Sequence, residues 1–193
     1  MEPYFKLIEG IDFTQETRQK IADNVLANCD NYFRSGTKED KFGFNDWNWF
    51  CPRDLMPRDL MDEVGKRFKI PVAYELLGQT PYTYGKIHID KQIPENPPRE
   101  TLINFPIYPL NKDLFSPTNF FQLESGTYDD YDNAVFKLKA SVDYSIGLPV
   151  IFNLQEFHNA VNPGSDYRFN VQFTTDLKFE EIVNIYNQGE LFV

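Results

Sequence analysis

The chain contains two histidines, and both stand among polar side chains that can bind a metal ion. Asp90 follows His88 by two positions, and His158 lies much further along the chain. In an extended strand, side chains at i and i+2 point to the same face, so His88 and Asp90 can bind one ion. A second imidazole would complete a set of two histidines and one carboxylate, which suits non-haem Fe(II) with O2. We predict that His88, Asp90 and His158 form this metal centre and carry the catalysis; a plain hydrogen-bonded His–Asp pair is the alternative.

Arg168 follows His158 by ten residues, about the length of one strand, a turn and the start of the next strand. A guanidinium at this place can make two parallel hydrogen bonds to a carboxylate ligand near the metal. Asn170 would lie on the same face of the strand. The alternative is a surface arginine that pairs with Asp166 or Asp176.

The ordered set of His88-x-Asp90, His158 and Arg168 resembles the Fe(II)/2-oxoglutarate-dependent oxygenases. Members of that superfamily hold iron with His-x-Asp/Glu and a distal His, and a following Arg or Lys binds the co-substrate. The run Arg-Glu-Thr-Leu-Ile-Asn-Phe at residues 99–105 resembles the strand after the first motif in prolyl-hydroxylase-like members. The resemblance covers residues 74–176.

The resemblance also implies how the co-substrate is held. Arg168 would bind the distal carboxylate of 2-oxoglutarate, with Asn170, Tyr84 and Thr101 as further cofactor-binding residues. Many relatives carry Ser where Asn170 stands, and Tyr84 is equally suited to filling the interior. Thr101 is expected to face the site, with Asn104 as the alternative, because a register shift of one residue exchanges the two faces of a strand.

The function implied is hydroxylation of an unactivated C–H bond, with succinate and CO2 as co-products and ascorbate as a candidate reductant. The substrate would be an amino acid, a peptidyl residue or another small molecule. Relatives that halogenate lack the carboxylate, so Asp90 favours hydroxylation. One alternative is a cupin-type metal enzyme that does not use 2-oxoglutarate, although such enzymes often use three or four histidines. The other is a non-catalytic jelly-roll module for binding or structure.

Composition sets further limits on the protein. With 193 residues, 41% hydrophobic and 16% aromatic, the chain is expected to form one folded domain. The net charge of −10 and the lack of a basic stripe disfavour nucleic acid as a partner. No apolar run reaches the ~18 residues of a membrane span, and no secretory signal is recognised. Cys29 and Cys51 could pair, but a reduced, cytoplasmic protein is the simpler interpretation.

The expected fold is mostly β with flanking helices: a double-stranded β-helix, or jelly roll, with N-terminal helices packed on one sheet. Residues 1–193 would form a single domain, with helical support in 1–69, the jelly-roll core in 70–176 and a closing helix in 177–193. Helical spacing predicts one helix from Asp12 or Thr14 to Phe33 and another ending near Lys69. Short β-rich runs between turn residues predict eight strands, at 71–77, 82–89, 101–106, 119–123, 134–139, 149–152, 157–161 and 168–175. Loops 36–52, 91–99 and 124–133 would set substrate specificity.

Overall fold

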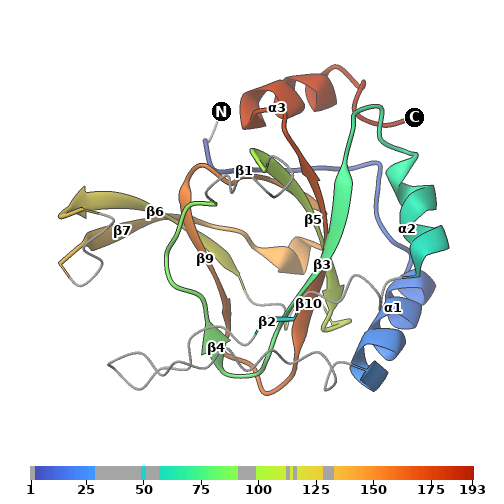
Figure 1. The fold of residues 1–193 in the computed structure, drawn as a ribbon, viewed down its shortest axis with the longest axis horizontal. Coiled ribbons are helices and arrows are strands. Elements are labelled where there is room, and N and C mark those ends of the chain that lie inside the picture. The colour runs from blue at the N-terminus through green and yellow to red at the C-terminus, as the bar shows by residue number, and fades with distance from the viewer. Residues whose placement is uncertain are drawn as a thin grey trace.

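The computed structural model describes residues 3–28, 49–50, 57–90, 99–111, 114, 117–127 and 133–193. Within these residues the chain is mostly β, with two antiparallel sheets and three α-helices (Figure 1). Cys29, Cys51, most of the expected loop at 36–52 and residues 91–98 and 128–132 lie outside the described part. Among the described helices, none combines the length and the apolar character that a membrane crossing requires.

The two sheets face each other, and a cavity lies between them. The larger sheet has six described strands, in the order β1 (Phe5–Leu7), β8 (Val150–Asn153), β5 (Thr101–Tyr108), β10 (Arg168–Thr175), β3 (Ala73–Gln79) and β2 (Trp49–Phe50). The smaller has four, in the order β4 (Thr83–Tyr84), β9 (Phe157–Asn162), β6 (Thr118–Ser125) and β7 (Val135–Ser141). The β6–β7 hairpin reaches out beyond the body of the protein (Figure 1). The predicted strands therefore form near their expected places, except that 82–89 yields only the short β4.

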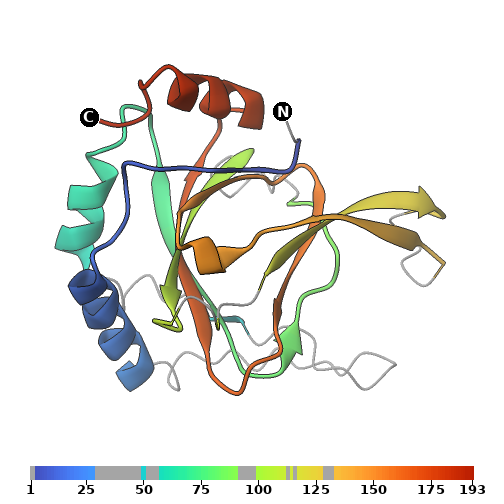
Figure 2. The ribbon, with the colours of Figure 1, turned by 180° about the vertical axis from the view of Figure 1, so that it is seen from behind.

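Helices α1 (Gln15–Asn28) and α2 (Arg58–Gly65) lie along the outer side of the larger sheet, and α3 (Phe179–Asn187) lies at one end of the molecule (Figures 1 and 2). Thr14 Oγ1 accepts a hydrogen bond from the Thr17 N–H at 3.1 Å, as expected of a helix N-cap. The second helix ends at Gly65, earlier than predicted. Phe68 instead forms an isolated β-bridge with Phe192, where the chain end pairs with it.

The larger sheet separates two groups of buried apolar side chains. On its helix side, Ile103, Phe105 and Val171 join residues of α1, α2 and α3 in the main core. On the side toward the smaller sheet, a second cluster includes Leu102, Val150, Phe152 and, from the smaller sheet, Phe120. Since side chains alternate along a strand, each central strand supplies both groups.

Strand β10 shows this division most clearly, since all eight of its residues are buried. Its helix-side residues Phe169, Val171 and Phe173 belong to the main core. The alternate residues Arg168, Asn170 and Gln172 are polar and line a cavity between the sheets. The fold thus directs a row of polar side chains into its own interior, which is unusual unless they bind one another or a ligand.

Candidate metal centre

The two histidines are brought together by a single backbone pairing. His158 lies on β9, and His88 lies in the extended segment after β4 rather than in a regular strand. The His88 N–H donates to the His158 carbonyl at 2.9 Å, and the His158 N–H donates back to the His88 carbonyl at 2.8 Å. Because such residues lie directly opposite each other, their side chains share a face. The imidazole centroids are 4.4 Å apart.

Both imidazoles are fixed in the same orientation by the same local contact. Nδ1 of His88 lies 2.8 Å from the Lys86 carbonyl oxygen, and Nδ1 of His158 lies 2.8 Å from the Glu156 carbonyl oxygen. A carbonyl oxygen can only accept a hydrogen bond, so Nδ1 carries the hydrogen in each ring. This leaves both Nε2 atoms directed at the site, as a metal ligand requires.

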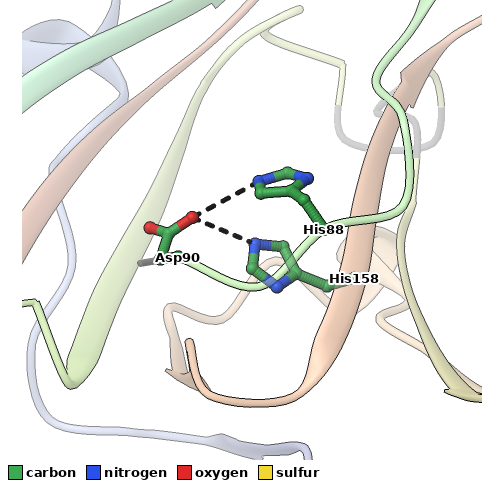
Figure 3. Close-up of side chains that lie close together, drawn as sticks. All are labelled: His88, Asp90 and His158. Atoms are coloured by element: carbon green, nitrogen blue, oxygen red, sulfur yellow. Dashed lines mark ion pairs between the residues drawn. The ribbon is translucent and has the colours of Figure 1, made fainter. Parts of the chain in front are cut away.

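Asp90 completes the group (Figure 3). Its Oδ1 lies 3.3 Å from Nε2 of His88 and 3.8 Å from Nε2 of His158. The Asp90 N–H donates to the Leu154 carbonyl at 3.2 Å, which fixes the backbone beside the site. Burial opposes ionisation of this carboxyl, but its interactions with His88, His158 and Arg99 outweigh burial and hold its pKa below the ordinary value.

The protonation state of His158 suits a ligand. Burial and the repulsion of neighbouring His88 lower its pKa from 6.5 to about 4, although Asp90 acts in the opposite direction. At neutral pH His158 is therefore uncharged, and its Nε2 presents a lone pair to Asp90 Oδ1. Two electron-rich atoms that face each other in this way are favourable when a cation lies between them.

In the described part of the chain, the ligand atoms of His88, Asp90 and His158 form a group in which all lie within 4.8 Å of one another. Two imidazole nitrogens and one carboxylate oxygen are ligands that first-row transition metals accept, and three ligands leave other coordination positions open. The residues present therefore fit a metal ion, and the structure brings together the three side chains that the sequence predicted.

The group lies in a cavity of about 310 Å³ between the sheets, which is at the lower end of the range for small-molecule sites. Its wall combines apolar side chains with a larger number of polar ones. Its lining comprises Leu77, His88, Asp90, Arg99, Leu102, Thr118, Phe152, Leu154, His158, Ala160, Arg168, Asn170 and Gln172.

Arg168 supplies a buried guanidinium to this cavity, with 2% of the residue exposed. Its Nη1 donates to Gln79 Oε1 at 2.6 Å and its Nη2 to Thr118 Oγ1 at 3.2 Å. The guanidinium carbon lies 5.7 Å from the centroid of the Tyr144 ring, within reach of a cation–π contact. Burial lowers the pKa of Arg168 and Tyr144 opposes this, and an arginine stays charged in proteins even so.

A network of neutral polar groups holds the surroundings of Arg168 in place. The Tyr144 hydroxyl accepts a hydrogen bond from Asn104 Nδ2 at 3.0 Å and pairs with Thr118 Oγ1 at 3.0 Å. Gln172 Nε2 in turn donates to Asn104 Oδ1 at 3.3 Å. Two further atoms, Asn170 Oδ1 and Gln172 Oε1, are buried without a hydrogen-bond partner within the described residues. A ligand with a hydrogen-bond donor would remove the cost of about 1–3 kcal/mol that each such acceptor atom carries.

The three other residues predicted to bind the co-substrate, Asn170, Thr101 and Tyr84, lie in different places. Asn170 lines the cavity beside Arg168. Thr101, which was expected to face the site, is not among the residues that line the cavity, whereas its neighbour Leu102 is. Strand alternation puts Thr101 on the same face as Ile103 and Phe105 of the helix-side core. The side chain of Tyr84 lies outside the described part of the structure.

Several residues beside the site were not predicted. Gln172 continues the alternation of Arg168 and Asn170, so strand periodicity could have indicated it. Gln79 lies opposite Arg168 in the pairing of β3 with β10, and only the register reveals this. Arg99, which lines the cavity near Asp90, stands inside the run that resembled the prolyl-hydroxylase-like strand.

Solved structures with a similar fold include the following three. AviO1 from Streptomyces viridochromogenes Tue57 is 13% identical at a TM-score of 0.50, over 91% of this chain and 91% of that one. A prolyl-4-hydroxylase from Pseudomonas putida is 12% identical at 0.50, over 90% and 92%. The non-haem alpha-ketoglutarate dependent carbocyclase SnoK, from nogalamycin biosynthesis, is 14% identical at 0.51, over 89% and 79%. The chain has the fold of these proteins.

The resemblance that the sequence suggested is therefore confirmed as a similarity of fold. No protein-family model matches the sequence, and the search of curated proteins gave no match either. A fold hosts many activities, so the chemistry has to be argued from the side chains in the cavity.

Proposed function

We propose that this protein is an Fe(II)- and 2-oxoglutarate-dependent oxygenase that hydroxylates an unactivated C–H bond. The observation that carries the proposal is the convergence of two imidazole Nε2 atoms and one carboxylate in a cavity that also contains a buried guanidinium. His88, Asp90 and His158 would hold the iron. When bound, the iron would couple O2 activation to decarboxylation of 2-oxoglutarate to succinate and CO2. On this proposal residues 70–176 form the jelly-roll core of a single domain, residues 1–69 support it and add β1 and β2 to the larger sheet, and residues 177–193 close it.

Arg168 would bind the distal carboxylate of 2-oxoglutarate. Gln79 and Thr118 hold two of its nitrogens, so the guanidinium is oriented before the ligand arrives. A carboxylate that meets this buried cation gains a charge-assisted hydrogen bond. Asn170 and Gln172 lie beside it in the cavity, and the amide N–H groups of each could donate to the same carboxylate.

The cavity walls would separate the reaction from bulk water. Leu102, Phe152 and Leu154 give an apolar lining, and a cavity of this size suits a small co-substrate together with one part of a substrate. The side chain that is oxidised would belong to an amino acid, a peptidyl residue or another small molecule. Ascorbate is proposed as a reductant that keeps the iron ferrous. Thr101 has no part in this proposal, because it does not line the cavity.

The first test is optical and needs no substrate. Purified protein is incubated without oxygen with Fe(II) and 2-oxoglutarate, and the weak visible charge-transfer band of the chelate is recorded. We expect the band in the wild-type protein and its loss in His158→Ala. A metal enzyme that does not use 2-oxoglutarate would bind Fe(II) without giving the band, and a binding or structural module would bind neither.

The second test follows succinate in air, with candidate amino acids and peptides added. Substrate should stimulate succinate release above the uncoupled rate. Asp166→Asn serves as the matched control for Asp90→Asn, since Asp166 is an acid paired with Tyr108 and does not line the cavity. Equal losses in both variants would contradict the assignment of Asp90 as a metal ligand.

A further inference from the structure

Arg99 is a second arginine at the cavity, and it lies at the metal end. Its Nη2 is 3.7 Å from Asp90 Oδ2 and 3.5 Å from Glu75 Oε2. All three side chains are largely enclosed, with exposures of 29% for Arg99, 18% for Asp90 and 15% for Glu75. An ion pair that is shielded in this way is screened less by water and salt than a surface pair.

The two oxygens of Asp90 have different surroundings. Oδ1 faces the imidazoles of His88 and His158, whereas Oδ2 faces Arg99. A carboxylate with one oxygen occupied by a guanidinium offers the other oxygen to a metal. The charge of Arg99 on Oδ2 therefore favours the rotation of the Asp90 carboxylate in which Oδ1 points into the site.

The backbone around this pair is fixed as well. Gln155 Nε2 lies 3.5 Å from the Asp90 carbonyl oxygen and 3.4 Å from the Arg99 carbonyl oxygen. The Leu154 N–H donates to the Glu100 carbonyl at 3.3 Å, next to the Asp90 N–H that donates to the Leu154 carbonyl. The segment between β8 and β9 thus ties residue 90 to residues 99 and 100, and the short distance between the two side chains is a consequence of the fold.

Glu75 supplies the third member of the arrangement. Glu75 lies on β3, two residues before Leu77, which lines the cavity, and four residues before Gln79, which contacts Arg168. Because side chains alternate along a strand, Glu75 shares their face. From there its carboxylate holds the same Arg99 nitrogen that faces Asp90. Glu75 thereby limits the positions that the long Arg99 side chain can take.

We propose that Arg99 is a positioning residue for the metal centre: it holds Asp90 Oδ2, with Glu75 as its anchor, so that Oδ1 is presented to the metal in one orientation. This inference rests on the proposed function, because it assigns Asp90 as a metal ligand. Partners of metal ligands typically change metal affinity by about 10- to 100-fold when they are removed. Arg99→Gln should therefore weaken metal binding by about this factor while His88, Asp90 and His158 remain in place.

The experiment uses Co(II) as the probe, because its visible absorption reports coordination as well as binding. Wild-type protein, Arg99→Gln, Arg99→Lys and Glu75→Gln are titrated with Co(II), and the dissociation constant and spectrum are recorded. We expect the largest loss of affinity in Arg99→Gln together with a changed spectrum, and a smaller loss in Arg99→Lys, which keeps the charge. Glu75→Gln should fall between the wild-type protein and Arg99→Gln.

Arg18→Gln is the matched control, because Arg18 is also a largely buried arginine paired with an aspartate, Asp12, but lies on α1 outside the cavity. It should lower thermal stability and leave Co(II) affinity unchanged. Co(II) affinity within about twofold of wild type and an unchanged spectrum in Arg99→Gln would overturn the inference, as would equal losses in the Gln and Lys variants. If instead the wild-type protein bound no Co(II), or His158→Ala bound it equally well, the proposed metal centre itself would be refuted.

Discussion

The two faces of strand β10 carry different kinds of buried side chain. Phe169, Val171 and Phe173 pack against the helices in the main core. Arg168 and the other polar residues of the opposite face line the cavity between the sheets. Both faces are buried, so burial alone does not tell core from site. The difference lies in how each face gains free energy.

On the helix side, the contribution comes from removing apolar surface from water and from close packing. On the cavity side, burying charge and amide groups costs free energy that their mutual hydrogen bonds only partly return. A face that costs stability is expected where its side chains bind something else. The comparison therefore predicts that changes on the helix side affect folding, whereas changes on the cavity side affect ligand binding.

The largest effect is expected for Phe173→Ala. Phe173 is fully buried, and its ring lies 4.9 Å from Phe68, 5.6 Å from Phe105 and 6.4 Å from Tyr74, measured between centroids. Its removal leaves a cavity in the core and should reduce the free energy of unfolding by about 3–5 kcal/mol. Denaturant unfolding measures this change. Metal affinity of the folded fraction should stay as in the wild type, and a selective loss of metal binding would contradict the division of the two faces.

Arg168→Met tests the opposite face of the same strand. The substitution removes the costly buried cation and keeps an unbranched side chain, but it leaves Gln79 Oε1 without its donor. The free energy of unfolding should therefore fall by about 1–2 kcal/mol, less than in Phe173→Ala. Affinity for 2-oxoglutarate should fall about 10- to 100-fold, because a hydrogen bond to a charged group contributes about 1.5–3 kcal/mol. Titration of the charge-transfer band measures the affinity. A large loss of stability with unchanged affinity would reverse the roles of the two faces.

The pH dependence of the metal-free protein gives a third test. The pKa of His158 is about 4 in the folded protein and 6.5 as its ordinary value, so the unfolded chain binds more protons between these limits. Stability is therefore full above pH 6.5 and is lost as the pH falls toward 4, by about 2 kcal/mol between pH 7 and pH 5. Lowering of the Asp90 pKa acts only near and below its ordinary 3.8.

Unfolding in denaturant at a series of pH values measures this slope. His158→Gln removes the imidazole that faces His88, Asp90 and Arg99, so most of the slope between pH 7 and pH 5 should vanish in this variant. A slope equal to that of the wild type would mean that another group is responsible.

Much of this arrangement was readable from the sequence because its signals are local. The order of His88-x-Asp90, His158 and Arg168 along the chain predicted which segments meet at the site. The structure brings His88, Asp90 and His158 together and places Arg168 in the same cavity. The face of Thr101 was not readable. Both faces of β5 mix apolar and polar residues, so no alternation distinguishes them, and a shift of one residue exchanges Thr101 for Leu102.

Contacts between distant strands were also beyond the sequence. The pairing of Gln79 with Arg168 depends on the register of β3 against β10. The approach of Arg99 to Asp90 depends on Leu154 and Gln155 in the segment between β8 and β9. His88 was expected in a strand but forms one isolated bridge with His158. That bridge is enough to align the imidazoles, so the metal site needed less regular structure than the strand argument assumed.

The smallest effect is expected from a pair of substitutions, one on the helix side of the larger sheet and one on the cavity side. Thr101 Oγ1 is buried without a hydrogen-bond partner among the described residues, so Thr101→Val removes an unsatisfied group and should leave stability unchanged or slightly higher. Thr118 Oγ1 contacts both Arg168 and Tyr144, so Thr118→Val should cost about 1 kcal/mol and weaken 2-oxoglutarate binding several-fold. Parallel unfolding and band titrations measure both variants. Since the two changes are chemically identical, a loss of 2-oxoglutarate affinity in Thr101→Val would show that Thr101, and not the face assigned to the cavity, contacts the co-substrate.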